Sequence, residues 1–416
     1  MRLLVLTHTF PPSYISNAKR PYYLVRGFLE AGWHVDVFTS AFGITSGASE
    51  TVLHPNLRIV RTQDPLVRLV GSALERQGLF RAGALAASAI LWPDPYVLWA
   101  RRTIRACRRG GPYDRVLTFV LPASMLLTGR PRHFIGPHCV FDYQESVTPY
   151  FRRHPRRSPL QRMLVPHLAK LESMTLHKAG RVVFTADTNR RAYVEQGLAL
   201  ETATAHVPYF FDAEVFRSPA RELVRDFQIV YFGTFDWRGE RSPETFLRAF
   251  AQFLQRHPEA RPKSRFLFYG NWLPEHNSFI EELKLGDVVT LQASVPYEQY
   301  LEKLKSSPVL LLVVSSAHNF FMPSKIVDYF GAGRPIMSFV PQESEMRRVL
   351  EQAGQAEFAS DEFDVAGGTA ALAKLWELYT AGSLRNPIGK TGFWSSEVQI
   401  PRYLELVTGV GKKSVL

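Results

Sequence analysis

Short apolar, β-rich runs alternate with helical segments along the whole chain, and this alternation constrains the fold most. An apolar run at 2–7, a helical pattern at 19–31 and an alternating run at 34–39 together predict a βαβ unit. In the second half, the run at 309–314 is continuously apolar, as expected of a parallel strand covered on both faces. Alternation in both halves predicts an α/β fold of two Rossmann-like, doubly wound domains.

The remaining elements continue this alternation. Further strands are expected at 56–61, 114–119, 133–141, 181–184, 206–208, 228–232, 264–269, 288–291 and 335–339. Further helices are expected within 64–110 and at 188–197, 244–255, 297–306 and 324–330.

The length of the chain sets the expected number of domains. Its 416 residues fit two domains, at about 100–200 residues for each. We expect an N-terminal domain at 1–215, a C-terminal domain at 216–395, and a C-terminal helix and tail at 396–416 that packs back on the N-terminal domain. Ligands of such sheets bind beyond the strand carboxyl ends, so we expect the two sheets to face a central cleft.

Positive charge is concentrated in one half of the chain. Residues 1–217 hold 28 Lys and Arg against 15 Asp and Glu, whereas residues 218–416 hold 22 against 23. Arginines gather at 101–109 and 152–162, beside apolar residues at 66–70 and 91–92. This combination predicts docking on an anionic membrane, with an ordinary solvated surface as the alternative. No nucleic-acid motif accompanies the charge, so we expect no nucleic-acid partner.

Several classes of protein are not favoured by the sequence. No GxGxxG follows the first strand, which argues against a dinucleotide enzyme. Two cysteines, Cys107 and Cys139, are too few for a disulfide framework or a zinc cluster. Neither a signal peptide nor an apolar run long enough to span a membrane is present. We therefore expect a cytoplasmic protein, peripheral at the inner membrane face.

The segment 323–336, Pro-Ser-Lys-Ile-Val-Asp-Tyr-Phe-Gly-Ala-Gly-Arg-Pro-Ile, is the strongest candidate site. It follows a buried strand, and Pro323 with Ser324 is a good start for a helix. Amides at a helix start favour a phosphate, and Lys325 adds a full positive charge. Asp328, one turn later, can reach a ribose hydroxyl. The alternative is an ordinary helix start with a solvated lysine.

A second candidate phosphate site lies at 233–243, where a strand ends in glycine and a basic loop leads into a helix. Gly233 and Thr234 end the strand, a place suited to a diphosphate. Arg238 or Arg241 can grip phosphate oxygens in two places, together with Lys325. The alternative is a surface loop with solvated arginines.

In the first half, polar residues at strand ends are candidates for binding an acceptor. Asp142 and Glu145 follow one strand, His8 follows another, and Asn17 lies in the loop after the first strand. A carboxylate there can hold an acceptor hydroxyl. The alternatives are a polar strand-end cluster and a structural histidine, and no Ser-His-Asp set or metal-spaced group stands out.

The segment 323–336 resembles the donor-site motif PSKxxEYxxxGxPv of GT-B glycosyltransferases of the retaining family-4 type. Other segments resemble that family in the same order along nearly the whole chain. They are the opening 1–40, the Trp-Pro-Asp-Pro-Tyr segment at 92–96 with Trp99, Asp-Tyr-Gln-Glu at 142–145 in place of D-x-R-D, 171–186, Val-Pro-Tyr-Phe-Phe-Asp at 207–212 and Gly-Thr-Phe at 233–235.

The sequence departs from the family at three places. Phe320 stands where the first of two motif glutamates is usual, eight positions before Asp328. Thr234 stands where many relatives have arginine, and 13–20 replaces a glycine-rich loop. These departures leave the donor sugar open.

The resemblance implies a glycosyltransferase that moves a sugar, with retention, from a nucleoside-diphosphate sugar to an acceptor. We expect the acceptor to be a cell-surface polysaccharide or lipid-linked glycan intermediate, and we expect no metal or other cofactor. Lys325 and Arg238 or Arg241 would stabilise the leaving diphosphate. An epimerase of the same fold and a non-catalytic nucleotide-sugar binder are the alternatives.

Overall fold

The computed structural model divides the chain into two compact units, Met1–Tyr209 with Val398–Leu416, and Phe210–Glu397. The structure describes residues 1–13, 16–41, 54–64, 91–107, 110–129, 136–153, 159–218, 224–235, 241–316, 319, 322–385 and 390–409. The first unit ends at Tyr209, earlier than the expected 215, and it contains the chain from Val398 onward.

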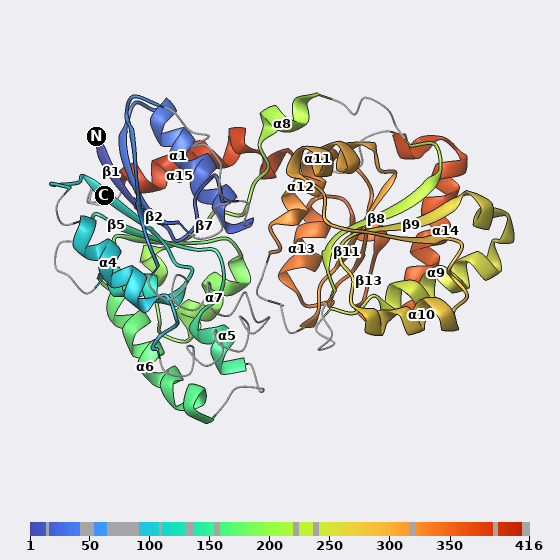
Figure 1. Cartoon of the computed structure of the whole chain (residues 1–416), viewed down its shortest axis with the longest axis horizontal. Coiled ribbons are helices and arrows are strands. Elements are labelled where there is room, and N and C mark those ends of the chain that lie inside the picture. Colours follow the sequence, from blue (N-terminus) through green and yellow to red (C-terminus); the bar gives the residue numbers. More distant parts are fainter. Residues whose placement is uncertain are drawn as a thin grey trace. The chain divides into compact units, whose positions relative to one another are not determined.

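The first unit contains a seven-stranded parallel sheet with the order β3-β2-β1-β4-β5-β6-β7 (Figure 1). Its strands are β1 (Arg2–Leu6), β2 (His34–Ser40), β3 (Leu57–Thr62), β4 (Arg115–Phe119), β5 (Cys139–Tyr143), β6 (Arg181–Phe184) and β7 (Thr204–His206). Its helices are α1 (Lys19–Glu30), α4 (Val97–Cys107), α5 (Thr148–Arg153), α6 (Pro159–Leu176), α7 (Asp187–Glu195) and the greater part of α15 (Ser396–Gly409).

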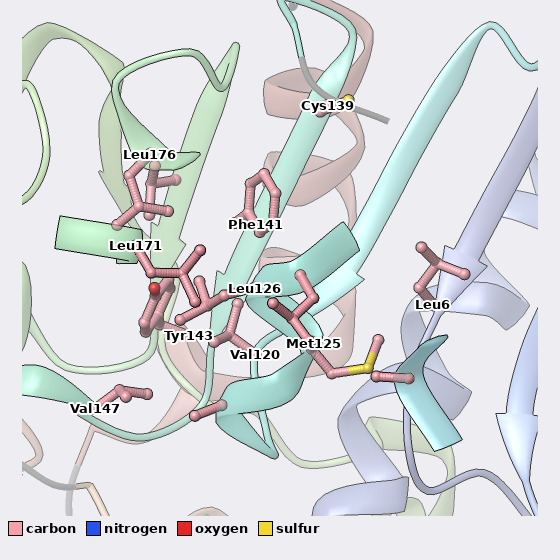
Figure 2. Packing of buried hydrophobic residues seen from close by; sticks show 14 of the residues in the cluster. Leu6, Val120, Met125, Leu126, Cys139, Phe141, Tyr143, Val147, Leu171 and Leu176 are labelled. Carbon is pink, nitrogen blue, oxygen red and sulfur yellow. The ribbon is translucent and has the colours of Figure 1, made fainter. Parts of the chain in front are cut away.

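Apolar side chains on the inner strands form the core of the first unit. Figure 2 shows Phe141 and Tyr143 of β5 beside Val120, Met125 and Leu126, and all five are fully buried. All five residues of β5 are buried, as expected of a parallel strand covered on both faces.

The last helix, α15, packs on the first unit and is tied to it by specific contacts. The Arg115 guanidinium donates from Nε to the Val407 carbonyl over 2.9 Å and from Nη2 to the Thr408 carbonyl over 3.2 Å. A methyl group at Gly27 of α1 would lie 2.3 Å from the Ile400 side chain, so glycine allows the two helices to approach closely. The two ends of the described chain are therefore built into one unit.

The second unit contains a six-stranded parallel sheet with the order β10-β9-β8-β11-β12-β13. Its strands are β8 (Phe227–Thr234), β9 (Ser264–Asn271), β10 (Val289–Gln292), β11 (Val309–Val313), β12 (Ile336–Phe339) and β13 (Ala359–Ser360). Its helices are α8 (Ala213–Arg217), α9 (Glu244–Arg256), α10 (Asn277–Glu282), α11 (Tyr297–Ser306), α12 (Lys325–Ala332), α13 (Glu345–Gln352) and α14 (Val365–Thr380).

Helices cover both faces of the second sheet. Alternate strand residues such as Ile229 and Leu311 pack in one cluster with Phe250 of α9 and Leu372 of α14. The helices α11 and α12 pack on each other and lie on the other face (Figure 1). This arrangement confirms the predicted fold class of two Rossmann-like, doubly wound domains.

Some expected elements differ in extent from those in the structure. The strand expected at 133–141 begins only at Cys139, and most of the segment expected to be helical at 64–110 lies outside the described residues, apart from α4. Cys107 and Cys139 are free and buried, and burial raises the pKa of both thiols. No helix in the described part of the chain has the length and apolar character needed to cross a membrane.

Candidate functional site

The strand order of the second sheet reverses between β8 and β11, which are neighbours in the sheet although β9 and β10 lie between them in sequence. Doubly wound sheets bind ligands beyond the strand carboxyl ends at such a reversal. Here β8 ends with Gly233 and Thr234, and α12 follows β11 and begins at Lys325. The two candidate phosphate segments of the sequence therefore meet at one edge of the sheet.

Lys325 reaches from the first turn of α12 to the end of β8. Its Nζ donates a hydrogen bond to the Phe232 carbonyl over 3.3 Å and lies 3.9 Å from the centre of the Tyr231 ring. Burial, and secondarily the positive charge of Arg241, lower the pKa of Lys325 from 10.5 to about 7. Because the ammonium form is disfavoured by its surroundings, an anion bound beside it would be strongly favourable.

The ring beneath Lys325 is held rigidly by aromatic neighbours. Tyr231 stacks on Phe235 with 4.2 Å between ring centres and an angle of 16°, and it stacks on Phe268 at 5.8 Å. Its hydroxyl donates to the Thr234 carbonyl over 3.4 Å. The position of the Lys325 ammonium is therefore largely set before any ligand binds.

Two glycines at the ends of β8 and β9 leave the backbone bare beside Lys325. Gly233 and Gly270 are paired in register, with φ of 133° and 150°. A methyl group at Gly270 would lie 1.8 Å from the Gly233 carbonyl oxygen, so no other residue fits there. A methyl group at Gly233 would lie 3.9 Å from Lys325 Nζ. Gly270 therefore allows β8 and β9 to approach closely near their ends, and Gly233 leaves bare backbone beside the ammonium.

Asp328 is buried and is oriented by a tyrosine of the neighbouring helix. The Tyr300 hydroxyl donates to Asp328 Oδ2 over 3.0 Å, and the Tyr300 ring lies edge-on to Phe232 at 4.8 Å. Burial, and the negative charge of Asp328, raise the pKa of Tyr300, so its hydroxyl stays protonated and remains a donor. Tyr300 could not be recognised from the sequence, because nothing in the local pattern of α11 separates it from a core tyrosine.

The start of α12 has the expected position but not the expected cap. Ser324 stands at the N-cap with helical angles of φ −59° and ψ −24°, and its side chain makes no capping hydrogen bond. The Pro323 carbonyl accepts from the Ile326 amide over 3.1 Å. Ser324 therefore leaves the amides of this helix start uncapped by its own side chain.

Of the remaining donor-site candidates, the structure describes Thr234 and Arg241. Thr234 is exposed at the end of β8, and Arg241 is near enough to Lys325 to affect its charge. Arg238 and Phe320 lie outside the described residues.

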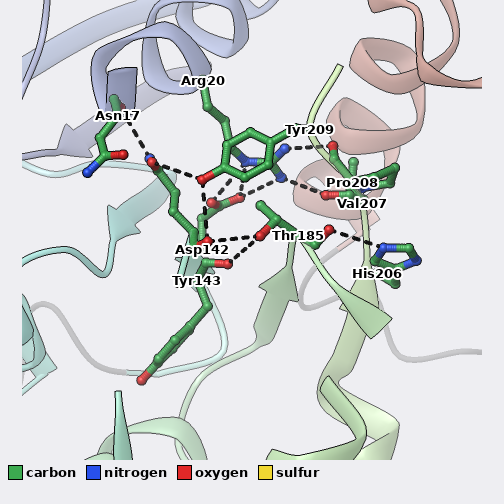
Figure 3. Close-up of polar contacts among 10 residues, drawn as sticks. Asn17, Arg20, Asp142, Tyr143, Thr185, His206, Val207, Pro208 and Tyr209 are labelled. Carbon is green, nitrogen blue, oxygen red and sulfur yellow. Dashed lines mark hydrogen bonds and ion pairs between the residues drawn. The ribbon is translucent and has the colours of Figure 1, made fainter. Parts of the chain in front are cut away.

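In the first unit, Asp142 is enclosed and paired with Arg20 of α1 (Figure 3). Arg20 donates to both Asp142 oxygens over 2.9 to 3.1 Å, and to the carbonyls of Val207 and Pro208 over 3.0 and 2.8 Å. Both side chains of the pair are almost completely buried. We therefore assign Asp142 to a structural ion pair that joins α1, β5 and the segment after β7, and not to acceptor binding.

Polar groups around this pair connect further segments. The side chain of Gln144 donates from Nε2 to the Asn17 backbone carbonyl over 3.4 Å. The backbone carbonyl of Gln144 accepts from the hydroxyls of Tyr209 and Thr185 over 3.3 and 3.0 Å. Figure 3 shows Asn17, Thr185 and Tyr209 around the Arg20–Asp142 pair. Asn17 thus lies next to the end of β5, as the acceptor hypothesis requires.

Glu145 is the expected acceptor carboxylate that remains accessible. Its side chain is exposed, directly after the buried end of β5. The protein atoms that crowd around it raise its pKa by desolvation. An exposed carboxylate at a strand end is free to accept a hydrogen bond from a hydroxyl donor.

His8 lies at the reversal of the first sheet, after β1, and it is buried. Its ring is 4.5 Å from the Tyr96 ring and 4.7 Å from the Trp99 ring, and burial lowers its pKa to about 4. It is therefore neutral at pH 7. Asp94 lies two residues before Tyr96. Its carboxylate accepts hydrogen bonds from the backbone amides of Tyr96 and Ser124 over 2.9 and 2.6 Å, which fixes the start of α4.

Comparisons with known proteins support the fold through structure alone. No protein-family model matches the chain, and no curated protein sequence matches it. Solved structures do match: the sucrose-phosphate synthase of Thermosynechococcus elongatus is 17% identical, with a TM-score of 0.64 and 98% of each chain covered.

Two further solved structures show the same similarity. The UDP-forming α,α-trehalose-phosphate synthase of Burkholderia xenovorans, in complex with glucose-6-phosphate, is 11% identical with a TM-score of 0.61, over 98% of this chain and 100% of that one. WaaG, a glycosyltransferase involved in lipopolysaccharide biosynthesis, is 12% identical with a TM-score of 0.58, over 98% and 100%. The chain therefore has the GT-B fold of these glycosyltransferases.

Proposed function

We propose that the protein transfers a sugar, with retention, from a nucleoside-diphosphate sugar to a hydroxyl group of an acceptor. The observation that carries the proposal is the position of Lys325, whose ammonium group lies near Arg241 and beside Gly233 at the strand reversal of the second sheet. The fold shared with sugar-phosphate synthases and a lipopolysaccharide glycosyltransferase supports it.

The chemistry follows from the charge of the leaving group. When the bond between the anomeric carbon and the diphosphate oxygen breaks, negative charge develops on the diphosphate. Lys325 and Arg241 are cations placed before the reaction in a partly dry site, where such charges stabilise a transition state most. We propose that these cations, with Arg238 as a further candidate, do this without a metal ion.

Donor binding uses the other residues at this edge of the sheet. The diphosphate would lie against the bare backbone at Gly233 and Thr234 and beside the start of α12, where the Ser324 side chain makes no capping hydrogen bond. Asp328, oriented by Tyr300, would accept from a ribose hydroxyl.

The first unit would hold the acceptor. Glu145 is the exposed carboxylate at the end of β5, and Asn17 lies near by. We propose a cell-surface polysaccharide or lipid-linked glycan intermediate as the acceptor, since this unit also carries surface features suited to anionic lipid.

The helix α6 provides these features. Met163 and Met174 are 71% and 55% exposed, and the exposed His167 and Lys170 lie between them at helical spacing. The exposed Lys178 follows the end of the helix. Glu172, the only acid of α6, is buried and accepts hydrogen bonds from Tyr143 and Tyr193 over 2.8 Å each. An exposed face with methionines and cations but no acid fits peripheral contact with an anionic inner membrane face.

Two other functions use the same donor site. An epimerase would convert the nucleotide sugar with no acceptor, so incubation of the protein with donor alone separates it from a transferase. A non-catalytic binder is favoured by the departure at Phe320, and donor binding without turnover across a broad acceptor panel would support it.

The test begins with thermal-shift measurements against UDP-, GDP- and dTDP-sugars, because a ligand of the folded state raises the melting temperature. Turnover of the best donor is then compared between wild type, Lys325→Ala and Lys374→Ala, an exposed lysine of α14. We expect Lys325→Ala to lose about 100-fold or more in turnover, and Lys374→Ala to behave as wild type. Equal turnover in all three proteins would refute the assigned role.

A further inference from the structure

A cavity of about 330 Å³ lies at the amino edge of the second sheet, at the other end of the strands from Lys325. Its walls include residues that immediately precede strands: Lys263 before β9, Pro308 before β11 and Arg334 shortly before β12. Val224 and Arg225, ahead of β8, complete this side. The cavity is thus built from the segments that enter the sheet, whereas the donor site is built from those that leave it.

Three cationic side chains line the cavity, and no carboxylate is among the described residues that line it. Arg225 and Lys263 are exposed. Arg334 is half-buried, and its Nε and Nη2 donate to the Lys305 carbonyl over 3.0 and 2.7 Å, which holds the guanidinium in place. Burial lowers the pKa of Arg334. A half-buried cation gains from a bound anion, because the anion compensates the hydration that burial removes.

Helix ends at the cavity work against an anion, but they are weaker than the cations. The helix α11 ends at Ser306 and α14 ends at Thr380, and both residues line the cavity. Each helix C-terminus contributes at most about half a negative charge. The carboxylate of Asp226, which follows Arg225 and helps to raise the pKa of Tyr379 in the cavity wall, adds one negative charge. Three full positive charges still exceed these contributions, which leaves a net charge of about +1 at the cavity.

We infer that this cavity is a second ligand site, which binds the phosphate group of a small phosphorylated sugar. A phosphate monoester carries about −1.5 to −2 charges at pH 7, so it would offset the positive charge of the cavity. The volume is at the lower end of small-molecule sites, about 300–1,000 Å³, and exceeds what phosphate alone requires. The Tyr379 ring and Leu384 offer apolar surface to the sugar, and Thr380 offers a hydroxyl.

The second site is separate from the donor site, so both can be filled at once. The helix α12 begins at Lys325 in the donor site and ends at Ala332, just before Arg334 in the cavity. Its eight residues span about 12 Å.

The experiment titrates glucose 6-phosphate and, separately, inorganic phosphate into the full-length protein saturated with UDP, by calorimetry. The test variant is Arg225→Gln with Lys263→Gln, because both side chains are exposed and their loss leaves the core intact. Arg256→Gln, an exposed cation at the end of α9, is the matched control. Melting temperatures verify that all variants are folded.

We expect glucose 6-phosphate to bind wild type and the control equally, and the double variant about tenfold or more weakly. Equal binding of inorganic phosphate would identify the phosphate alone as the recognised group. Absence of binding to UDP-saturated wild type, or equal affinity of the double variant and the control, would overturn the site. A failure of UDP itself to bind would count against the proposed function and would leave the comparison of variants intact.

Discussion

The hydroxyl of Tyr300 donates a hydrogen bond to Oδ2 of Asp328 over 3.0 Å, so one helix of the second unit orients the carboxylate of another. The pair lies 28 positions apart in sequence, on α11 and α12. If Asp328 holds the ribose, Tyr300 is a positioning residue for the donor.

Replacing Tyr300 by phenylalanine removes this bond and keeps the ring. We expect the KM for the donor to rise by roughly 3- to 10-fold, with a smaller effect on kcat, because a hydrogen bond to a charged group is worth about 1.5 kcal/mol or somewhat less when water can replace it. Steady-state kinetics measures both constants. Tyr113→Phe is the control, since it removes a tyrosine–aspartate bond of 2.8 Å to Asp36 in the first unit. An unchanged donor KM would exclude the positioning role.

Donor affinity should depend on pH through Lys325. Its pKa is about 7 without ligand, and a bound diphosphate would raise this pKa. Affinity for UDP is therefore expected to fall as pH rises above about 7, by at most about tenfold per unit, with uptake of a proton on binding. Calorimetry in buffers of different ionisation enthalpy measures this uptake. Lys325→Arg should bind without such pH dependence, and a wild-type affinity that is flat between pH 6 and 9 would contradict the assignment.

The same lysine should affect stability in the opposite direction. Its pKa in the folded chain lies below the value of 10.5 in the unfolded chain. Between these values the unfolded state binds the extra proton, so the contribution of Lys325 to stability increases as pH rises from about 7 toward 10.5. The free energies of unfolding of wild type and Lys325→Met, measured by denaturant melts across this range, should therefore converge as the pH rises. Any pH dependence common to both proteins cancels in this comparison.

Gly270→Ala should damage both stability and the donor site. The new methyl group would meet the Gly233 carbonyl oxygen at 1.8 Å in a backbone conformation that alanine rarely adopts. We expect a loss of more than about 2 kcal/mol in the free energy of unfolding, and weaker UDP binding, because β8 and β9 must separate at their ends. Gly286→Ala, where nothing lies within 4 Å, is the control. Normal melting and UDP affinity in Gly270→Ala would show that the close approach is not required.

Variants of the Arg20–Asp142 pair distinguish a structural role of Asp142 from a role in binding the acceptor. Asp142→Ala leaves Arg20 buried without its partner, so we expect about 3–5 kcal/mol of destabilisation. The double variant Arg20→Met, Asp142→Leu should recover only part of this loss, because the carbonyls of Val207 and Pro208 also lose their donor. It should keep the wild-type KM for the acceptor. Chemical denaturation and acceptor kinetics test the two statements. If the double variant is stable but no longer binds the acceptor, Asp142 belongs to the acceptor site.

The exposed face of α6 predicts membrane binding that depends on both apolar contact and charge. Liposomes rich in anionic lipid should carry wild type upward in flotation, and added salt should release it. Replacing Met163 and Met174 by serine should reduce the floated fraction without changing the fold, since both side chains are exposed. Equal flotation on neutral and anionic liposomes would remove the electrostatic part of the proposal.

The donor end of the second unit could be predicted from sequence because its signals are local. A buried strand, a helix start and Lys325 lie within one contiguous segment, and parallel strands bring their carboxyl ends to one edge. The strand that ends at Gly233 is recognisable in the same way. The role of Gly270 could not be predicted, because a glycine at a strand end usually marks only a turn. Its close approach to Gly233 can be recognised only when the register between β8 and β9 is known.

The candidate acceptor site was harder to predict for a physical reason. Arg20 and Asp142 are 122 positions apart, so nothing near either residue shows that the two charges compensate each other. Glu172 is similar, since its carboxylate is satisfied by Tyr143, Tyr193 and the Thr148 amide from three other segments. Long-range pairing decides whether a carboxylate is structural or available, and a single sequence does not contain that pairing.

The attachment of α15 to Arg115 and Gly27 has a consequence for how the protein is made. During synthesis on the ribosome, the segment that forms the second unit emerges complete while the first unit still lacks its final helix. The second unit can then reach its native state first, and the first unit can close only after the last turns have left the exit tunnel. A nascent chain stalled before α15 would thus expose the α1 surface that Ile400 covers in the finished protein, and this surface would be a natural binding place for chaperones.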